Sequence, residues 1–328
     1  MPKIDDVAQR AGVSVTTVSR VLNNRGYISQ KTRDKVNQAM AELNYQPNEM
    51  ARALFRRRSN MIGLIIPTVA HPFFGELAYH LEYYADQRGY KLLLCNSNRN
   101  LDKEMQYIEM LKKNQVDGII MGSAALEVEH YLNLKLPIVS FERSVSEHIP
   151  RVTSDNHMGG RLAARHLRGQ GCERLAYVCR GLDGPHHQAL SAVGRGEGFR
   201  EELALSGIEP LYMEMEAGAD PYAGEAELAK LLQAHPEIDG IFASSDVIAS
   251  EVIQACRKLG REVPQQLRVV GYDDSLVASL VSPRLTTIRQ PVREMSERTI
   301  RLLLQQIEGE QVPMSNRFQV TLVVRDST

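Results

Sequence analysis

The sequence predicts an α/β protein, with a small all-α head at the N-terminus and a larger core that contains two open parallel sheets. Residues 1–46 carry short amphipathic segments at helical spacing and no strand-like run. From residue 61 onward, continuous apolar runs alternate with longer amphipathic segments, which is typical of parallel sheets buried between helices. Residues 61–328 are too many for one such sheet, so we expect two lobes.

The composition is that of a globular protein with a sizeable core, because 43% of the 328 residues are hydrophobic and 24% are charged. The longest apolar run, at residues 61–67, is too short to cross a bilayer, and the chain opens without a leader-like segment. The four cysteines form no CxxC pair and have no metal-ligand spacing. We therefore expect a cytoplasmic protein with free thiols and with no membrane contact, metal or cofactor.

The head is basic and the rest of the chain is acidic. Residues 1–60 contain 11 Lys or Arg against 5 Asp or Glu, whereas the remaining residues contain 28 against 35. A basic segment on an otherwise acidic chain favours a polyanionic partner for that segment. The alternative is an ordinary solvated surface, which the charge by itself does not exclude.

Two short helices are predicted at the start of the head. The first carries an apolar stripe at helical spacing, formed by Ile4, Val7, Ala8 and Ala11. Gly12 is expected to end this helix and Ser14 to cap the next one, whose apolar positions are Val15, Val18, Val21 and Leu22. Two short helices joined by a turn that contains Gly predict a helix-turn-helix.

Two further helices are predicted before the core. Ser29 should cap a third helix, whose inward residues are Val36, Met40 and Leu43. Pro47 then interrupts the helical pattern, and Asn48 is a plausible cap for a fourth, short helix with the sequence NEMARALF.

The second helix presents small polar side chains instead of bulk on its outward face, formed by Ser14, Thr16, Thr17, Ser19 and Arg20. A recognition helix needs such short groups because long apolar ones do not fit the major groove. Arg20 could contact guanine through two hydrogen bonds, while Thr17 and Ser19 could hold phosphates. A generic amphipathic helix has similar apolar spacing and is the alternative.

Seven apolar runs predict the strands of the core, at residues 61–67, 90–97, 117–123, 137–141, 174–179, 239–245 and 267–272. Ligands of open parallel sheets bind outside the carboxyl ends of the strands. These ends carry hydroxyl, amide and carboxylate side chains together with Arg. Because charged side chains can each bridge two neighbouring hydroxyl groups, this set favours a sugar.

Residues 4–54, IDDVAQRAGVSVTTVSRVLNNRGYISQKTRDKVNQAMAELNYQPNEMARAL, resemble the DNA-binding head of the LacI/GalR family of bacterial transcription regulators. The resemblance continues through the whole chain in the motifs IGLIIP, VDGIIMGS, SDN, RGEGF, FASSD, VVGYDD and LTTIRQP. The overall texture is most similar to sucrose operon repressors. The resemblance implies a periplasmic-binding-protein-like core that closes on a small ligand.

For the head, the resemblance implies base contacts by Val15, Thr16 and Arg20. It implies contacts to the DNA backbone by Ser14, Thr17, Ser19, Asn23, Tyr27, Ser29 and Thr32. The segment with Asn48 corresponds to a hinge helix that orders on the operator and inserts Leu54 into the minor groove, where an apolar wedge kinks the DNA. The alternative is that Leu54 is an ordinary buried residue of a connecting helix.

For the core, the resemblance places five residues at effector positions: Phe74, Asn156, Arg195, Ser245 and Asp273. Ser245 stands where sugar-binding members often have Asn, and residues 217–225 lack an aromatic at the usual stacking place, for which Tyr222 is a shifted candidate. His186 and Gln188 are loop candidates, with solvation as the alternative. Asp246 is interpreted as a helix cap instead of a ligand contact.

The sequence does not favour a nucleotide site, a metal site or a catalytic site. GRGEGF does not follow a first strand and is not GxGxxG, so nucleotide binding is not favoured. His186 and His187, with His71, could suggest a metal site, but adjacent histidines point apart on most backbones and no Cys or carboxylate lies at helical spacing beside them. Asp273 and Asp274 have no nucleophile elbow, HExxH motif or Walker lysine beside them. We therefore expect no enzymatic activity.

The expected domains are a helix-turn-helix at residues 1–46, a hinge helix and linker at 47–60, and a core at 61–328. Within the core we expect one lobe at about 61–157 and 289–317 and the other at about 158–288 and 318–328.

The expected function is that of a cytoplasmic, nucleoid-associated homodimer that represses a carbohydrate operon. It binds operator DNA and a sugar or sugar phosphate, for which a sucrose-related sugar is the candidate. Operator and sugar should alter each other's affinity. The alternatives are a global catabolite-type regulator that responds to a phosphorylated partner protein, a sugar-binding transport protein, or a sugar-processing enzyme.

Overall fold

The computed structural model describes residues 2–23, 25–46, 58–98, 100–122, 130–131, 133–143, 146–180, 190–215 and 224–328. The chain forms two compact units, Met1–Ser59 and Asn60–Thr328. Each unit is described separately below.

The first unit is helical and contains α1 (Ile4–Ala11), α2 (Val15–Leu22) and α3 (Gln30–Glu42). Gly12 adopts the left-handed conformation with a φ of 66° and ends α1, as predicted. Ser14 and Ser29 cap α2 and α3, which confirms both predicted caps. The core of this unit is formed by Val7, Val18 and Val36, which are fully buried.

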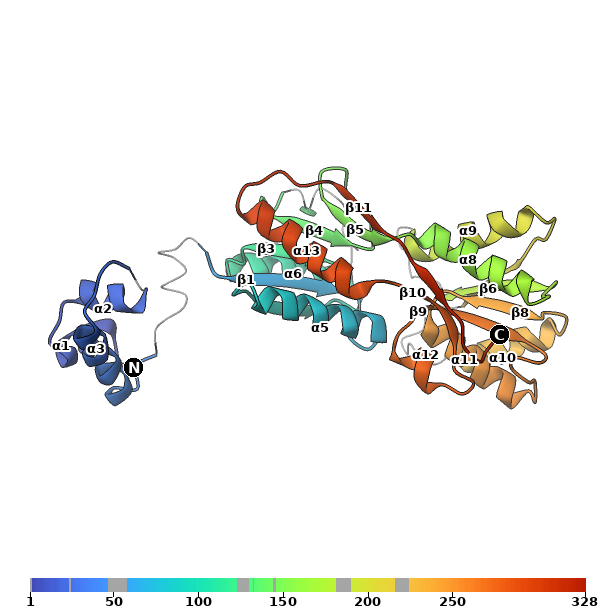
Figure 1. The fold of residues 1–328 in the computed structure, drawn as a ribbon, viewed down its shortest axis with the longest axis horizontal. Coiled ribbons are helices and arrows are strands. Elements are labelled where there is room, and N and C mark those ends of the chain that lie inside the picture. Colours follow the sequence, from blue (N-terminus) through green and yellow to red (C-terminus); the bar gives the residue numbers. More distant parts are fainter. Residues whose placement is uncertain are drawn as a thin grey trace. The chain divides into compact units, whose positions relative to one another are not determined.

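The second unit contains two six-stranded sheets, and the first of them is entirely parallel. Its strand order is β11-β5-β4-β3-β1-β2. The strands are β1 (Met61–Ile66), β2 (Lys91–Asn96), β3 (Gly118–Met121), β4 (Ile138–Phe141), β5 (Arg151–Ser154) and β11 (Ser315–Phe318). One face packs against α5 (Pro72–Asp86) and α13 (Val292–Ile307), and the other packs against α6 (Leu101–Lys113) (Figure 1).

The second sheet has the order β12-β10-β9-β8-β6-β7 and is parallel except for the β10–β12 pair. Its strands are β6 (Leu175–Arg180), β7 (Leu211–Met215), β8 (Gly240–Ala243), β9 (Arg268–Asp273), β10 (Thr286–Arg289) and β12 (Thr321–Val323). The described helices of this lobe are α8 (Asn156–Gly169), α9 (Leu190–Ala204), α10 (Glu225–Ala234), α11 (Asp246–Lys258) and α12 (Leu276–Leu280).

The chain passes between the two sheets three times. It leaves the first sheet after β5, returns to that lobe after β10 to form α13 and β11, and leaves again after β11 to form β12 (Figure 1). Each sheet is therefore completed by a strand from the last part of the chain.

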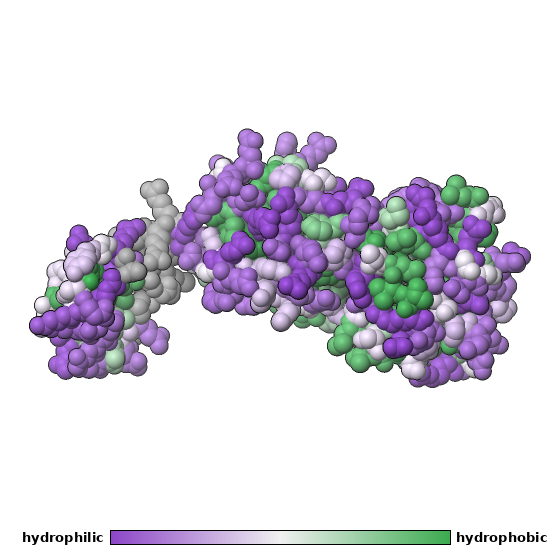
Figure 2. All heavy atoms as spheres, in the orientation of Figure 1, coloured by the Kyte–Doolittle hydropathy of each residue, from purple (hydrophilic) through white to green (hydrophobic). Residues whose placement is uncertain are grey.

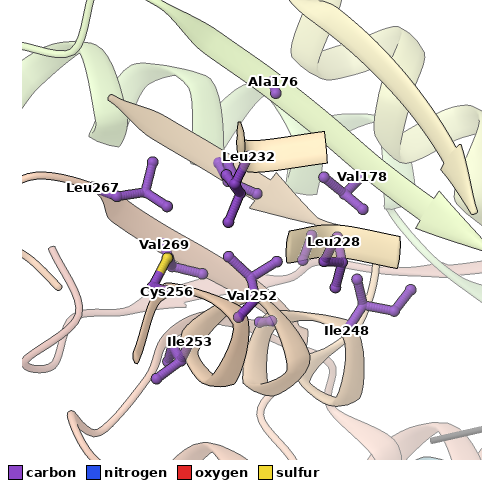
Figure 3. Packing of buried hydrophobic residues seen from close by; sticks show 14 of the residues in the cluster. Ala176, Val178, Leu228, Leu232, Ile248, Val252, Ile253, Cys256, Leu267 and Val269 are labelled. Atoms are coloured by element: carbon purple, nitrogen blue, oxygen red, sulfur yellow. The ribbon is translucent and has the colours of Figure 1, made fainter. Parts of the chain in front are cut away.

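Apolar side chains on both faces of each sheet hold the lobes together. In the second lobe, Val252 and Ile248 of α11 lie close to Leu228 of α10 and to the strands beneath them (Figure 3). The visible surface of the core is mostly hydrophilic, although hydrophobic side chains gather in places on it (Figure 2). Burial of this kind is the main source of the stability of such a domain.

All seven apolar runs form strands, as the sequence predicts. The run at β2 is not buried on both faces, because β2 is an edge strand and Leu94 is 47% exposed. Five strands were not predicted: β5, β7, β10, β11 and β12. These strands mix polar with apolar residues, and all five lie at or next to a sheet edge, where continuous apolar sequence is not required.

Candidate DNA interface and effector site

The outward face of α2 has the character expected of a recognition helix. Ser14, Val15, Thr16 and Arg20 are exposed, whereas Val18 and Val21 are buried against the rest of the unit. Val15 is 39% exposed, so it does not belong to the core although it falls in the apolar pattern. Its isopropyl group is available for apolar contact with a thymine methyl.

The starts of α2 and α3 are built alike. The Ser14 hydroxyl accepts a hydrogen bond from the Thr17 backbone N–H at 3.1 Å and lies 2.9 Å from the Thr17 hydroxyl. Ser29 and Thr32 repeat this arrangement at 3.3 Å and 2.9 Å. The positive end of a helix dipole attracts anions, so both helix starts suit DNA phosphates.

Other candidate DNA contacts differ in how they are held. The Asn23 amide donates to the Ser19 carbonyl oxygen at 2.8 Å, so these two residues form one local unit at the end of α2. Tyr27 is 99% exposed. Arg20 is exposed and has no ion pair with the described part of the head, which leaves its guanidinium available to a partner. Asn48 and Leu54 lie outside the described residues.

In the core, Arg195 is the centre of a buried polar cluster. Its Nε donates to Asn156 Oδ1 at 2.7 Å and its Nη1 donates to the Ser244 carbonyl oxygen at 2.6 Å. The guanidinium carbon lies 3.5 Å from the centre of the Tyr272 ring, which is a cation–π arrangement. Only 7% of Arg195 is exposed, so its position is firmly determined.

The packing of α8 on α9 determines where Arg195 lies. A Cβ atom on Gly160 would overlap the Arg195 carbonyl oxygen, and one on Gly198 would overlap the His157 carbonyl oxygen. Only glycine permits this approach of two backbones. The glycines therefore bring Arg195 to the start of α8, where Asn156 receives its hydrogen bond.

Glu142 joins this cluster from the first lobe and was not among the predicted site residues. Its Oε2 accepts from the Asn156 amide at 2.7 Å, and its Oε1 accepts from the Ser154 backbone N–H. Glu142 has a positive φ of 58°. It directly follows the predicted strand at 137–141, and a polar residue at the carboxyl end of a parallel strand is a candidate for ligand binding. This position could have identified Glu142 from the sequence.

Asp273 also belongs to this cluster, with its Oδ1 3.8 Å from Arg195 Nη1. It is 5% exposed and accepts a hydrogen bond from Gln290 Nε2 at 2.8 Å. Burial raises the pKa of Asp273 from its ordinary value to about 7, against the opposing effects of Arg195 and Gln290. Near neutral pH this carboxyl group can therefore exist in either protonation state.

Ser245 caps α11, and Asp246 has a different role from the one predicted. The Ser245 hydroxyl caps α11 by accepting from the Ile248 N–H at 3.3 Å, so Ser245 is the cap and the interpretation of Asp246 as the cap was wrong. Asp246 accepts from the Ser275 N–H at 2.7 Å and from the Thr287 hydroxyl at 2.5 Å. Burial, with the nearby Asp273, raises its pKa well above the ordinary value. Asp246 thus links the loop after β9 to β10.

Phe74 stands apart from this cluster. It is half-buried on α5, and its ring meets Phe73 at 5.3 Å and His71 at 5.9 Å in edge-to-face geometry. In the described residues, no hydrogen bond or ring contact joins it to Arg195. The other loop candidates, Tyr222, His186, His187 and Gln188, lie outside the described residues.

A cavity of about 530 Å³ lies beside the cluster, between the first turn of α5 and the residues after β9. It is lined by Pro72, Gly75, Glu76, Asp274, Ser275, Leu276, Ser279 and Arg325. Burial, with the charge of Asp274, raises the pKa of Glu76. Within the described parts of the chain, no group of His, Cys, Asp and Glu is arranged to hold a metal, and no helix is long and apolar enough to span a membrane.

Comparison with known proteins matches both parts of the chain to families. Residues 3–48 match the family model of bacterial regulatory proteins of the lacI family, and residues 164–328 match that of periplasmic binding protein-like domains. The ribose operon repressor of Halalkalibacterium halodurans is 41% identical over 332 residues, which cover 100% of this chain and 97% of the relative. The chain belongs to the LacI family.

A second operon repressor and a solved structure of the LacI family are also similar to this chain over nearly its whole length. The sucrose operon repressor of Pediococcus pentosaceus is 41% identical over 317 residues, which cover 97% of this chain and 96% of the relative. The crystal structure of the lac repressor dimer bound to operator and an anti-inducer is similar with a TM-score of 0.85 and 28% identity, covering 99% of this chain and 98% of that one. The predicted resemblance to sucrose operon repressors is confirmed, and ribose operon repressors are as similar.

Proposed function

We propose that this LacI-family protein is a homodimeric transcriptional repressor of a carbohydrate-utilisation operon, in the cytoplasm and at the nucleoid. Its operator affinity is controlled by a small sugar or sugar phosphate that binds between the two lobes. Relatives that match it over nearly their whole length are repressors of ribose and sucrose operons. Two-fold symmetry of such a dimer requires a pseudo-palindromic operator.

The observation that carries the proposal is the buried cluster around Arg195. This guanidinium connects Asn156, which is bonded to Glu142 at the end of β4, with Asp273 at the end of β9. The cluster therefore contains groups from the carboxyl ends of both sheets, where ligands of parallel sheets bind. A guanidinium, an amide and carboxylates together can donate to and accept from the hydroxyl groups of a sugar.

The head supports the DNA-binding part of the proposal. The exposed Arg20 can bind guanine through two hydrogen bonds, and the capped starts of α2 and α3 can receive phosphates. Asn23 and Tyr27 add polar groups at the end of α2 and after it. The positions of Asn48 and Leu54 at the hinge remain part of the proposal on the grounds of family membership.

The test uses the full chain and DNA that flanks its own gene. We expect DNase footprinting to reveal a protected pseudo-palindrome, and calorimetry to detect binding of D-ribose, sucrose or one of their phosphates. The bound sugar should change the operator affinity by a factor of about 5 to 150. Binding of DNA without binding of any sugar would refute control by a sugar, and turnover of a sugar would refute the assignment as a regulator.

A further inference from the structure

Two consecutive aspartates at the end of β9 have a backbone conformation that only glycine adopts without cost. The φ angles are 108° at Asp273 and 56° at Asp274. Residues held in such regions persist only when their surroundings determine them. The contacts around these two aspartates therefore have to maintain the conformation.

The Asp274 carboxylate lies between two guanidinium groups. Its Oδ2 accepts from Arg289 Nε at 2.5 Å, and its Oδ1 accepts from Arg325 Nη2 at 2.6 Å. Only 7% of the Asp274 side chain is exposed. Arg325 is itself held, because its Nη1 donates to the Leu285 carbonyl oxygen at 2.8 Å. We call Asp274, Arg289 and Arg325 the arginine clamp.

The clamp lies directly beside the residue that faces Arg195. Arg289 is opposite Asp273 in the β9–β10 ladder, and the next residue, Gln290, donates to the Asp273 carboxylate. Arg289 and Gln290 thus hold two consecutive aspartates from two consecutive positions. The same two positions begin the segment that leads from β10 to α13 in the other lobe.

We propose that Asp274 is a positioning residue for effector binding: the arginine clamp holds the backbone of Asp273 and Asp274 in its left-handed conformation and so directs the Asp273 carboxylate toward Arg195. The proposal rests on the proposed function of the Arg195 cluster as an effector site. Asp274 acts through Asp273, and the clamp transmits the position of the segment between the lobes to this site.

Two substitutions separate the conformational role from a role in contact or charge. Both Asp274→Ala and Asp274→Gly remove the clamp, but only glycine adopts a positive φ without cost. With D-ribose and sucrose as probes, we expect Asp274→Ala to weaken binding by about tenfold and Asp274→Gly to recover most of this loss. Equal losses in the two variants would overturn the proposal, as would unchanged binding in Asp274→Ala.

Asp86→Ala is the matched control, because Asp86 pairs with Lys91 at 2.5 Å in an exposed ion pair at the end of α5, away from the clamp. It should bind the probes as the unsubstituted protein does. If the unsubstituted protein binds neither D-ribose nor sucrose nor one of their phosphates, the proposed effector site is contradicted, and crystal structures of the unliganded variants still test the role of the clamp. We expect Asp274→Ala to lose the positive φ angles and to separate Asp273 from Arg195 beyond 3.8 Å, and retention of both would refute the proposal.

Discussion

Substitution of Arg195 by Met should destabilise the core by an amount that depends on pH. Arg195 Nη1 is 3.8 Å from Asp273, and both side chains are buried. At an effective dielectric constant near 20, two unit charges at this distance attract by about 4 kcal/mol. Removal of one partner from a buried pair typically costs about 3–5 kcal/mol, so we expect a loss of this size near pH 8.

The loss should be smaller at acidic pH because Asp273 can then become neutral. In the folded protein the pKa of Asp273 is already raised by burial to about 7, so its ionisation lowers stability as the pH rises through that value. Without Arg195 the pKa rises further, and the folded variant has to lose a more tightly held proton. We expect the penalty of Arg195→Met to grow by about 1 kcal/mol between pH 6 and pH 8.

Urea unfolding followed by circular dichroism at both pH values measures the free energy of unfolding for this comparison. The double variant Arg195→Met with Asp273→Asn is the control, since it removes both charges and should show no growth of the penalty with pH. An equal penalty at pH 6 and pH 8 in the single variant would show that the charge of Asp273 is not what Arg195 balances.

Three further predictions concern the helices and the effector site. Gly160→Ala should reduce sugar binding and thermal stability because the added Cβ displaces the Arg195 backbone. Gly169→Ala on the same helix is the control, since a Cβ there meets nothing within 4 Å and should leave both quantities unchanged. Equal calorimetric results for the two variants would contradict this prediction. Arg20→Ala should lower operator preference by about 1–3 kcal/mol in gel-shift competition and leave sugar binding intact; an unchanged preference would remove Arg20 from base recognition. Sugar affinity should rise between pH 6 and pH 8, because the Asp273 carboxyl ionises in this range and becomes a better hydrogen-bond acceptor; Asp273→Asn should abolish this trend. The charged and titratable groups around Asp273 are Arg195, Glu142, Glu76 and Asp246. A flat calorimetric profile in the unsubstituted protein would contradict the last prediction.

The strands and helix caps that could be predicted are those whose formation depends on local sequence alone. Apolar runs of parallel strands are buried on both faces, and Ser14 and Ser29 precede helical patterns, so these elements follow from local sequence. The strands β10, β11 and β12 could not be predicted, because their pairing depends on residues far away in the sequence. Their own residues are too mixed in polarity to form a recognisable run.

The candidate site shows the same division. Arg195, Asn156 and Asp273 were predicted and are connected by short contacts, whereas Glu142 was missed although it bonds to Asn156. Asp246 was interpreted as the cap of α11, but Ser245 is the cap. Both residues precede or begin this helix, so only the geometry shows whether the hydroxyl or the carboxylate accepts from the helix backbone. Contacts between neighbouring strands of one sheet, such as those of the arginine clamp, cannot be predicted from local sequence.

The three passages of the chain between the sheets determine when the core can fold during synthesis. The core of the first lobe includes Met295, Ile300 and Leu303 of α13, and its edge strand β11 ends at residue 318. A ribosome that has made residues 60–154 has therefore produced a lobe that lacks a covering helix and an edge strand. The head contains its own buried residues and can fold much earlier, so a prematurely released chain would carry a folded head on an incomplete core. A fragment that ends at residue 154 would thus carry a DNA-binding head without Asn156, Arg195 and Asp273 of the candidate effector site, which are made later.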